Sequence, residues 1–145
     1  MDTCRIKEKT VKKSIVVHTG AGADRDLSQE LKSLECEHIE LRRMGPRRTP
    51  EAVLDAVRDA DVALCGGEPY TREVFQGAPG LKAVIRYGVG VDTIDLDAAT
   101  EFGVVIGHMP DFCIPEVANH ALVLLLDCAK KVRHLDATIR AQGWM

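Results

Sequence analysis

The sequence has few aromatic residues, no excess of basic residues and no long apolar run. Only 4% of its 145 residues are aromatic, and 19 basic residues stand against 22 acidic ones, for a formal net charge of -3. This composition argues against a dedicated nucleic-acid-binding protein, which needs positive charge and aromatic stacking platforms. The longest apolar run, residues 121–126, is far shorter than the roughly 20 residues that cross a bilayer. The sequence therefore predicts neither a nucleic-acid nor a membrane partner.

The cysteines form no paired pattern. They are Cys4, Cys36, Cys65, Cys113 and Cys128, an odd number with no CxxC spacing. Neither a disulfide framework nor a zinc site is predicted from such a pattern. The N-terminal segment is charged and lacks the apolar centre of a signal peptide. We therefore expect a cytoplasmic protein in which residues 1–13 form a disordered tail.

Short β-branched runs alternate with amphipathic segments along residues 14–110. The apolar runs predict five strands, at residues 14–19, 38–43, 61–67, 81–86 and 104–108. The helical segments between them are expected to begin near Asp26, Pro50, Thr71 and Asp95, and Gly103 is expected to end the last. Strands that are apolar on both faces need helices on both sides of a parallel sheet. We predict an α/β domain with a doubly wound, five-stranded parallel sheet of the flavodoxin-like or Rossmann-like kind.

Residues 111–145 depart from this alternation. Without an internal Gly or Pro, the chain is predicted to run as one long helix from about Pro115 to Ala141. The centre of this segment, ALVLLLDCA, is apolar all round, which a helix tolerates only when it is packed on more than one side. Another domain or another subunit is expected to cover it. Because the chain stops soon after this helix, we also expect it to be cut from a longer protein.

The loop after the fourth strand is the best candidate for a ligand site. Gly88 and Gly90 lack a Cβ, so backbone N–H groups can approach a carboxylate closely. The loop also follows the carboxyl end of a strand, where open α/β sheets bind ligands. Arg86 is placed to bind the same anion in bidentate fashion. The alternative is that the glycines only form a tight turn and that Arg86 pairs with Asp92 or Asp95.

Three further patterns are weaker. GVGVDT is a poor dinucleotide fingerprint, because Thr93 stands at the third glycine position and His108 about where a ribose-binding acid is expected. His108, Cys113 and His120 fit no zinc spacing, so no metal site is predicted. The basic run at residues 42–48 is interpreted as a solvated loop rather than a phosphate-binding patch, given the negative net charge.

From Leu81 to Trp144 the sequence resembles the D-isomer-specific 2-hydroxyacid dehydrogenases, a family that includes phosphoglycerate dehydrogenase. The matching segments are LKAVIRYGVGVD, IDLDAATEFG, VVIGHMPDFC and EVANHALVLLLDCAKKVRHLDATIRAQGW, which follow one another without gaps. Residues 1–80 match only in their strand–helix alternation and in the segment DADVALCGG. The segments RYGVGVD and MPDFC are most similar to the bacterial relatives of the C-terminal-binding protein corepressors.

The resemblance implies part of an oxidoreductase that uses NAD or NADP to interconvert small D-2-hydroxy acids and 2-oxo acids. It implies that Arg86, Gly88, Val89 and Gly90 bind the substrate. It also implies that Val89 and Val117 border the nicotinamide. Residues 14–110 would then form the substrate-binding domain, and residues 111–145 an interdomain segment and the first long helix of an NAD-binding domain.

The resemblance also implies what this chain lacks. The family's GxGxxG motif and its catalytic Arg, Glu and His follow the long helix, so no catalytic residue is expected in this chain. The cofactor would be bound mainly by the missing domain, the chain alone would be inactive, and the long helix would form a homodimer. In the corepressor branch the corresponding domain binds short peptides. A protein-interaction module, or a remnant without function, therefore stays an alternative.

Overall fold

A computed structural model describes residues 13–20, 25–34 and 38–144. It divides into two compact units, residues 1–110 and residues 111–145. Cys4, Cys36 and nearly all of the expected N-terminal tail lie outside the described residues.

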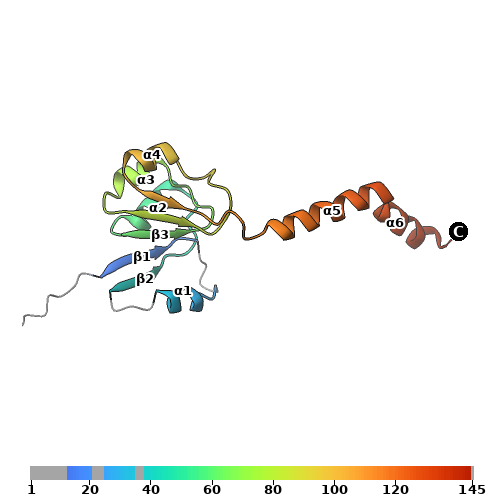
Figure 1. Cartoon of the computed structure of the whole chain (residues 1–145), viewed down its shortest axis with the longest axis horizontal. Helices are drawn as coiled ribbons and strands as arrows, with labels where there is room; N and C mark the ends of the chain where they lie inside the picture. The colour runs from blue at the N-terminus through green and yellow to red at the C-terminus, as the bar shows by residue number, and fades with distance from the viewer. Residues whose placement is uncertain (1–12, 21–24, 35–37, 145) are drawn as a thin grey trace, which may run out of the picture. The chain divides into compact units, whose positions relative to one another are not determined.

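The first unit is built on a parallel sheet with the strand order β2-β1-β3-β4-β5. All strand arrows in Figure 1 point toward the same edge of this sheet. The doubly wound five-stranded sheet predicted from the sequence is confirmed. Its elements, in chain order, are β1 (Ser14–His18), α1 (Ser28–Ser33), β2 (Ile39–Arg43), α2 (Pro50–Val57), β3 (Val62–Cys65), α3 (Arg72–Gly77), β4 (Ala83–Arg86), α4 (Leu96–Glu101) and β5 (Val105–Gly107).

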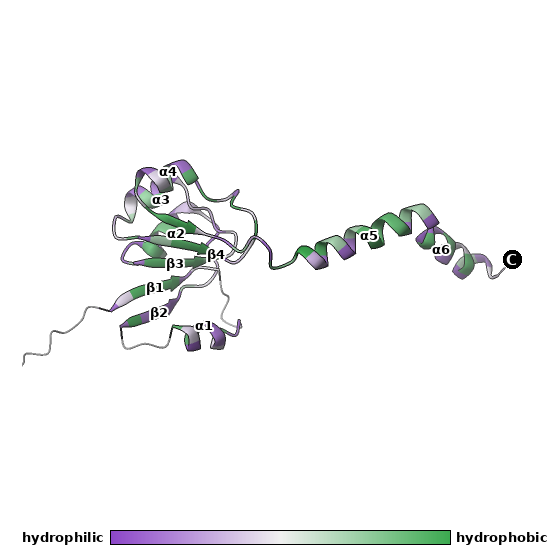
Figure 2. Ribbon diagram, viewed as in Figure 1, coloured by the Kyte–Doolittle hydropathy of each residue, from purple (hydrophilic) through white to green (hydrophobic). Residues whose placement is uncertain are grey.

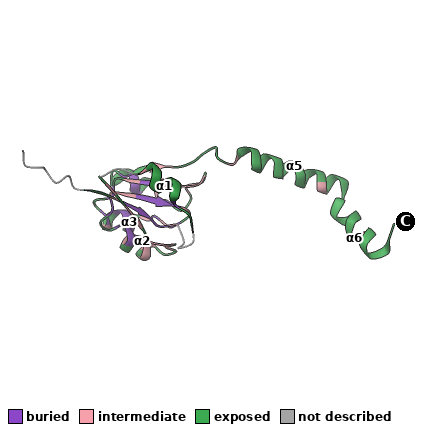
Figure 3. Cartoon of the chain, turned by 90° about the horizontal axis from the view of Figure 1, so that it is seen from below, coloured by how far each residue is buried: buried purple, intermediate pink, exposed green. Residues whose placement is uncertain are grey.

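The core lies between this sheet and helices α2, α3 and α4. Side chains from the three central strands meet apolar side chains of these helices, and the fully buried ones include Val17, Val53, Val57, Val74 and Val84. Burying each such side chain is worth about 1.5–3 kcal/mol. Figure 3 shows α1 on one side of the sheet and α2 and α3 on the other. The chain moves across the sheet in one direction from β1 to β2 and in the opposite direction from β2 to β5. Because each crossover is right-handed, this reversal places α1 on the opposite face from the later helices.

Local signals set the ends of several helices. The Thr49 hydroxyl accepts a hydrogen bond from Ala52 N (3.3 Å), and Pro50 is the first residue of α2 as expected. Gly103 follows the last turn of α4 with φ +70, which confirms the expected left-handed C′ glycine.

Helix α1 differs from its prediction. The N-cap residue of α1 is Leu27 rather than Asp26. Asp26 precedes this N-cap, and its carboxylate accepts a hydrogen bond from Ser28 N (2.9 Å), the first residue of the helix. Leu27 is buried, but Leu31 is 53% exposed and no residue within α1 is buried. Leu31 is the one leucine within this six-residue helix, and Leu27 and Leu34 lie at its two caps.

The second unit corrects the prediction of one long helix. It contains two helices, α5 (Ile114–Lys130) and α6 (Val132–Gln142), separated by Lys131 in the left-handed conformation with φ +54. The Asp127 carboxylate accepts a hydrogen bond from Arg133 N (3.1 Å), so it caps the start of α6 from the last turn of α5. No Gly or Pro marks this break, which is why the sequence pattern predicts a continuous helix.

Apolar residues surround the axis of α5, as the green colour in Figure 2 shows. Residues 122–126 are five consecutive apolar side chains, each at least 52% exposed, and no residue of α5 or α6 is buried. In the described part of the chain, no helix combines the length and the hydrophobicity that spanning a membrane requires.

Candidate functional site

The carboxyl ends of β1, β3 and β4 meet at one edge of the sheet. Backbone hydrogen bonds join them there, from Thr19 N to Leu64 O (3.0 Å) and from Tyr87 N to Cys65 O (2.9 Å). The Gly88–Val89–Gly90 segment, which we call the glycine loop, leaves the sheet directly after Tyr87. The loop therefore occupies the position where open parallel sheets bind ligands, as the sequence predicts.

Arg86 lies against the glycine loop and has buried, unsatisfied N–H groups. A Cβ placed on Gly88 would lie 3.4 Å from Nε of Arg86, and one placed on Gly90 would lie 3.9 Å from Nη1. Nε and Nη1 are both buried, and neither has a hydrogen-bond partner among the described residues. Leaving charged donors unsatisfied in a protein is costly, so such groups indicate a site for an anion.

The alternative in which Arg86 pairs with a neighbouring aspartate does not match the structure. Within the described ranges Arg86 forms no ion pair, and the Asp95 carboxylate instead accepts a hydrogen bond from Ala98 N (2.9 Å) at the start of α4. Asp92 is exposed, and its Oδ2 would lie 2.7 Å from a Cβ on Gly90.

The glycines of this loop provide space rather than an unusual backbone conformation. Neither Gly88 nor Gly90 has a positive φ. The missing Cβ of Gly90 instead leaves room for the Asp92 carboxylate, whereas a Cβ on Gly88 would make only ordinary contact with Arg86. This refines the sequence interpretation, in which the same glycines allow backbone N–H groups to approach an anion.

The residues after β5 hold the carbonyl groups of the glycine loop. Met109 N donates to Gly88 O (3.1 Å), and Nδ1 of His108 lies 2.9 Å from Val89 O. In the described part of the chain, the N–H groups of Val89 and Gly90 donate no hydrogen bond. The loop thus presents two free backbone donors beside the Arg86 guanidinium.

A stack of side chains borders this edge, and sequence reasoning missed it. The ring of buried His18 stacks on Tyr87 with 5.4 Å between centroids, and the Arg25 guanidinium lies 5.2 Å from the centroid of the Tyr87 ring. Burial, followed by the positive charge of Arg25, lowers the pKa of His18 below its usual value of 6.5. The sequence signal that could have predicted this site is the position of His18 directly after the apolar residues of β1.

Cys65 and Tyr70, which lie near this edge, are both protonated at neutral pH. Cys65 is 1% exposed, and burial raises the pKa of its thiol to about 12. Burial also raises the pKa of Tyr70, whose hydroxyl lies 3.2 Å from the Thr19 hydroxyl. The nearby Glu68 carboxylate accepts from Gly66 N (2.7 Å). Neither Cys65 nor Tyr70 is ionised near neutral pH, so neither provides a nucleophile.

The glycine loop does not fit a dinucleotide. Helix α4 begins only at Leu96, and its first turn is already capped by the carboxylate of Asp95, where a pyrophosphate would need free N–H groups. His108, near the position of a ribose-binding acid, instead contacts Val89 O. From the glycine loop to α4, the described residues therefore offer no uncapped helix start for a cofactor's phosphates.

Other candidate residues belong to other elements or have structural partners. No group of His, Cys, Asp and Glu in the described residues is arranged to hold a metal ion. Within the basic run, the interpretation as a solvated loop fails for Arg42, which belongs to β2 and pairs with Glu40 and Asp59 at 2.6 Å each. Val117 lies in the second unit, on α5, and is 62% exposed. Its contact with a nicotinamide stays a prediction.

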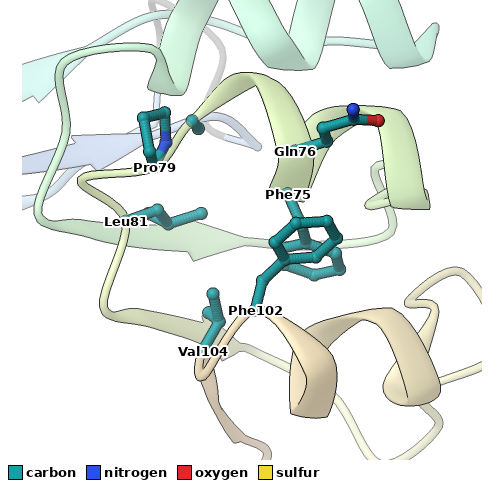
Figure 4. A pocket seen from close by; sticks show the side chains of 7 residues that line it. Phe75, Gln76, Pro79, Leu81, Phe102 and Val104 are labelled. Atoms are coloured by element: carbon teal, nitrogen blue, oxygen red, sulfur yellow. The ribbon is translucent and has the colours of Figure 1, made fainter.

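A small hollow lies at the opposite edge of the sheet, near the amino ends of the strands. It has a volume of about 180 Å³ and is lined by residues around the amino ends of β4 and β5, among them Phe75, Leu81, Phe102 and Val104. Figure 4 shows these side chains around the hollow, with Gln76 the one polar side chain among those labelled. None of its lining side chains carries a charge, so the hollow has no side chain that could form an ion pair with a charged substrate.

Comparisons with known proteins agree with this fold. The model of the "D-isomer specific 2-hydroxyacid dehydrogenase, catalytic domain" family matches residues 14–143. D-3-phosphoglycerate dehydrogenase from Mycobacterium leprae is 39% identical over 120 residues, which are 81% of this chain and 22% of that protein. Glyoxylate reductase from Thermococcus onnurineus is 40% identical over 95 residues, which are 65% of this chain and 28% of that protein.

Solved structures show the same fold. D-lactate dehydrogenase from Aquifex aeolicus, in complex with NAD and lactic acid, superposes with a TM-score of 0.73 at 17% identity, over 91% of this chain and 38% of that one. The chain spans 22% of the length of the mycobacterial relative and 28% of the length of the archaeal one.

Proposed function

The chain belongs to the D-isomer-specific 2-hydroxyacid dehydrogenase family, and we propose that it is the part of such an enzyme that binds the carboxylate of a small D-2-hydroxy or 2-oxo acid. The observation that carries this proposal is the pair of buried, unsatisfied nitrogens of Arg86 against the glycine loop. The enzyme as a whole would transfer a hydride between the substrate and NAD or NADP.

The glycine loop and Arg86 supply complementary groups for a carboxylate. Two free backbone N–H groups donate to its oxygens, and the guanidinium provides the opposite charge and further donors. Hydrogen bonds to charged groups contribute about 1.5–3 kcal/mol each, which is enough to fix the orientation of a small acid. A fixed carboxylate leaves the adjacent C2 atom in one position, and positioning of this kind is a large part of catalysis.

The described residues of this chain do not fit the phosphates of a dinucleotide, so we place the main cofactor site outside them. When bound, the nicotinamide supplies or accepts the hydride. Val89 is 44% exposed and Val117 is 62% exposed, so both side chains are available for the nicotinamide contact that the family resemblance implies.

The long apolar helix supports a homodimer in the same proposal. Exposed leucines on α5 need a cover, and a second copy of this helix is one surface that can provide it. Free thiols at Cys65, Cys113 and Cys128 support a location in the reducing cytoplasm.

The proposal predicts that the chain binds pyruvate through its carboxylate. In a ¹⁵N-resolved NMR titration, pyruvate should shift the amide signals of Val89 and Gly90, whereas hydroxyacetone, which has no carboxylate, should not. Arg86→Gln should weaken binding by about tenfold or more, because it removes a charged donor group. Gly90→Val should also block binding, because its Cβ would lie 2.7 Å from Oδ2 of Asp92 and its branched side chain would fill the space beside the loop N–H groups.

Gly67→Val is the matched control. Gly67 also follows a strand at this edge, but a Cβ placed there meets no atom within 4 Å, so pyruvate binding should persist. Equal shifts with pyruvate and hydroxyacetone, or unchanged affinity in both Arg86→Gln and Gly90→Val, would contradict a carboxylate site at this loop.

A further inference from the structure

We propose that His108 is a positioning residue that orients the glycine loop for the substrate carboxylate. This inference rests on the proposed function of that loop. His108 follows β5 directly, and the pairing of Gly107 with Ile85 brings it beside the end of β4. Its Nδ1 lies 2.9 Å from Val89 O, and the next residue, Met109, donates its N–H to Gly88 O (3.1 Å).

The planarity of the peptide bond converts these two contacts into an orientation. In a trans peptide, the C=O and the N–H of the same plane point in opposite directions, and the described peptides are all trans. Because Gly88 O points toward Met109, the N–H of Val89 points away from it. Because Val89 O points toward His108, the N–H of Gly90 points away as well. Residues 108 and 109 therefore turn both free donors toward the same side of the loop.

The chemistry of this contact determines which nitrogen of His108 carries hydrogen. A carbonyl oxygen only accepts, so Nδ1 must be the donor, which leaves Nε2 as the acceptor nitrogen of the Nδ1–H tautomer. Without this donor, the Val89–Gly90 peptide plane is free to rotate, and the carboxylate must then order it on binding. The side-chain amide of Asn carries its nitrogen on Cγ, as Nδ1 is carried in His, so Asn is able to replace this one function.

The first experiment reads the tautomer and needs no ligand. Long-range ¹H–¹⁵N NMR at alkaline pH should show the Nδ1–H tautomer for His108, whereas an unconstrained imidazole favours Nε2–H. His38, an exposed histidine before β2, serves as the internal reference. An Nε2–H tautomer at His108 would overturn the proposal even if the loop binds pyruvate.

The second experiment separates positioning from stability. His108→Leu should weaken pyruvate binding about two- to tenfold, the range expected for one hydrogen bond, with the unfolding midpoint unchanged because the side chain is exposed. His108→Asn should restore wild-type affinity, and His38→Leu should leave it unaltered. Equal affinity in His108→Leu and the wild type would overturn the positioning role.

Failure of the two proposals is distinguishable. If wild-type chain shows no pyruvate binding, the carboxylate site is wrong. The role of His108 is then decided by the tautomer and by hydrogen exchange of the Met109 amide, which donates to Gly88 O in the glycine loop. Loosening of the loop in His108→Leu should change this exchange, and His108→Asn should reverse the change. Identical exchange in all three proteins would overturn the role of His108.

Discussion

At the scale of single residues, two basic side chains near the same sheet edge have opposite fates. The buried Nε and Nη1 of Arg86 have no hydrogen-bond partner among the described residues. His18 is fully buried, and its Nδ1 accepts a hydrogen bond from Gly20 N (3.2 Å), which requires an unprotonated Nδ1. Burial and then Arg25 lower its pKa, so His18 is neutral at physiological pH. Positive charge at this edge therefore belongs to the arginines.

The lowered pKa of His18 predicts that the protein loses stability in mild acid. Below the unfolded-state value of about 6.5, the unfolded chain binds a proton that the folded chain resists. The free energy of unfolding should therefore fall as pH drops through 6.5, until the pH reaches the lower folded-state pKa. Denaturant unfolding between about pH 8 and pH 5, the range in which histidine titrates, would measure this slope.

His18→Gln should flatten that slope, whatever it does to stability at neutral pH, because glutamine does not titrate. His38→Gln, at an exposed position, is the matched control and should leave the slope unchanged. The same pH dependence in His18→Gln and the wild type would show that other groups cause it.

At the scale of elements, capping decides where helices begin and end. The carboxylates of Asp95 and Asp127 each accept a backbone N–H at a helix start, but only Asp95 does so from the usual position before the helix. Asp127 reaches across the break at Lys131 from the preceding helix. This hydrogen bond supplies an acceptor for the start of α6, although no glycine stands at the break between α5 and α6.

Removal of the Asp127 carboxylate is expected to fray α6. Asp127→Ala leaves Arg133 N without its acceptor, and losing such a cap costs about 1 kcal/mol. The ¹³Cα shifts of residues 132–138 should move toward coil values. Asp127→Asn keeps an acceptor oxygen and should preserve the shifts. Unchanged shifts in Asp127→Ala would mean that the break is stable without this cap.

At the scale of the whole molecule, the exposed apolar surface of α5 predicts self-association. Burying one leucine is worth about 1.5–3 kcal/mol, so several exposed leucines strongly favour a partner. Sedimentation should find a dimer or larger species for this chain, and the triple replacement of Leu122, Leu125 and Leu126 by Ser should shift it toward monomer. Leu31→Ser, at an equally exposed but isolated position on α1, should have no such effect. A stable wild-type monomer at tens of micromolar would contradict the proposed dimer.

Catalytic activity is also a property of the whole molecule. We expect no measurable turnover of pyruvate with NADH from this chain by itself, because the described residues around the proposed carboxylate site offer no fitting dinucleotide site, and the family resemblance gives none of the chain's histidines the acid–base role. A spectrophotometric assay of NADH oxidation would test this expectation. Turnover at the rate of a complete enzyme would show that the catalytic groups are present in this chain.

The sequence by itself determined the features that depend on local pattern. Period and composition were sufficient for the parallel sheet, the left-handed Gly103 and the loop after β4, because burial and backbone conformation leave a regular trace in neighbouring residues. Only the tertiary structure decided the features that join distant residues. The contact of His108 with Val89 spans 19 positions, and only the placed surroundings of Arg86 show that no described residue forms an ion pair with it. The sequence did not predict the break at Lys131 for a related reason. The hydrogen bond there joins Arg133 N to the Asp127 carboxylate six residues earlier, and such a contact leaves no pattern in the hydrophobic periodicity.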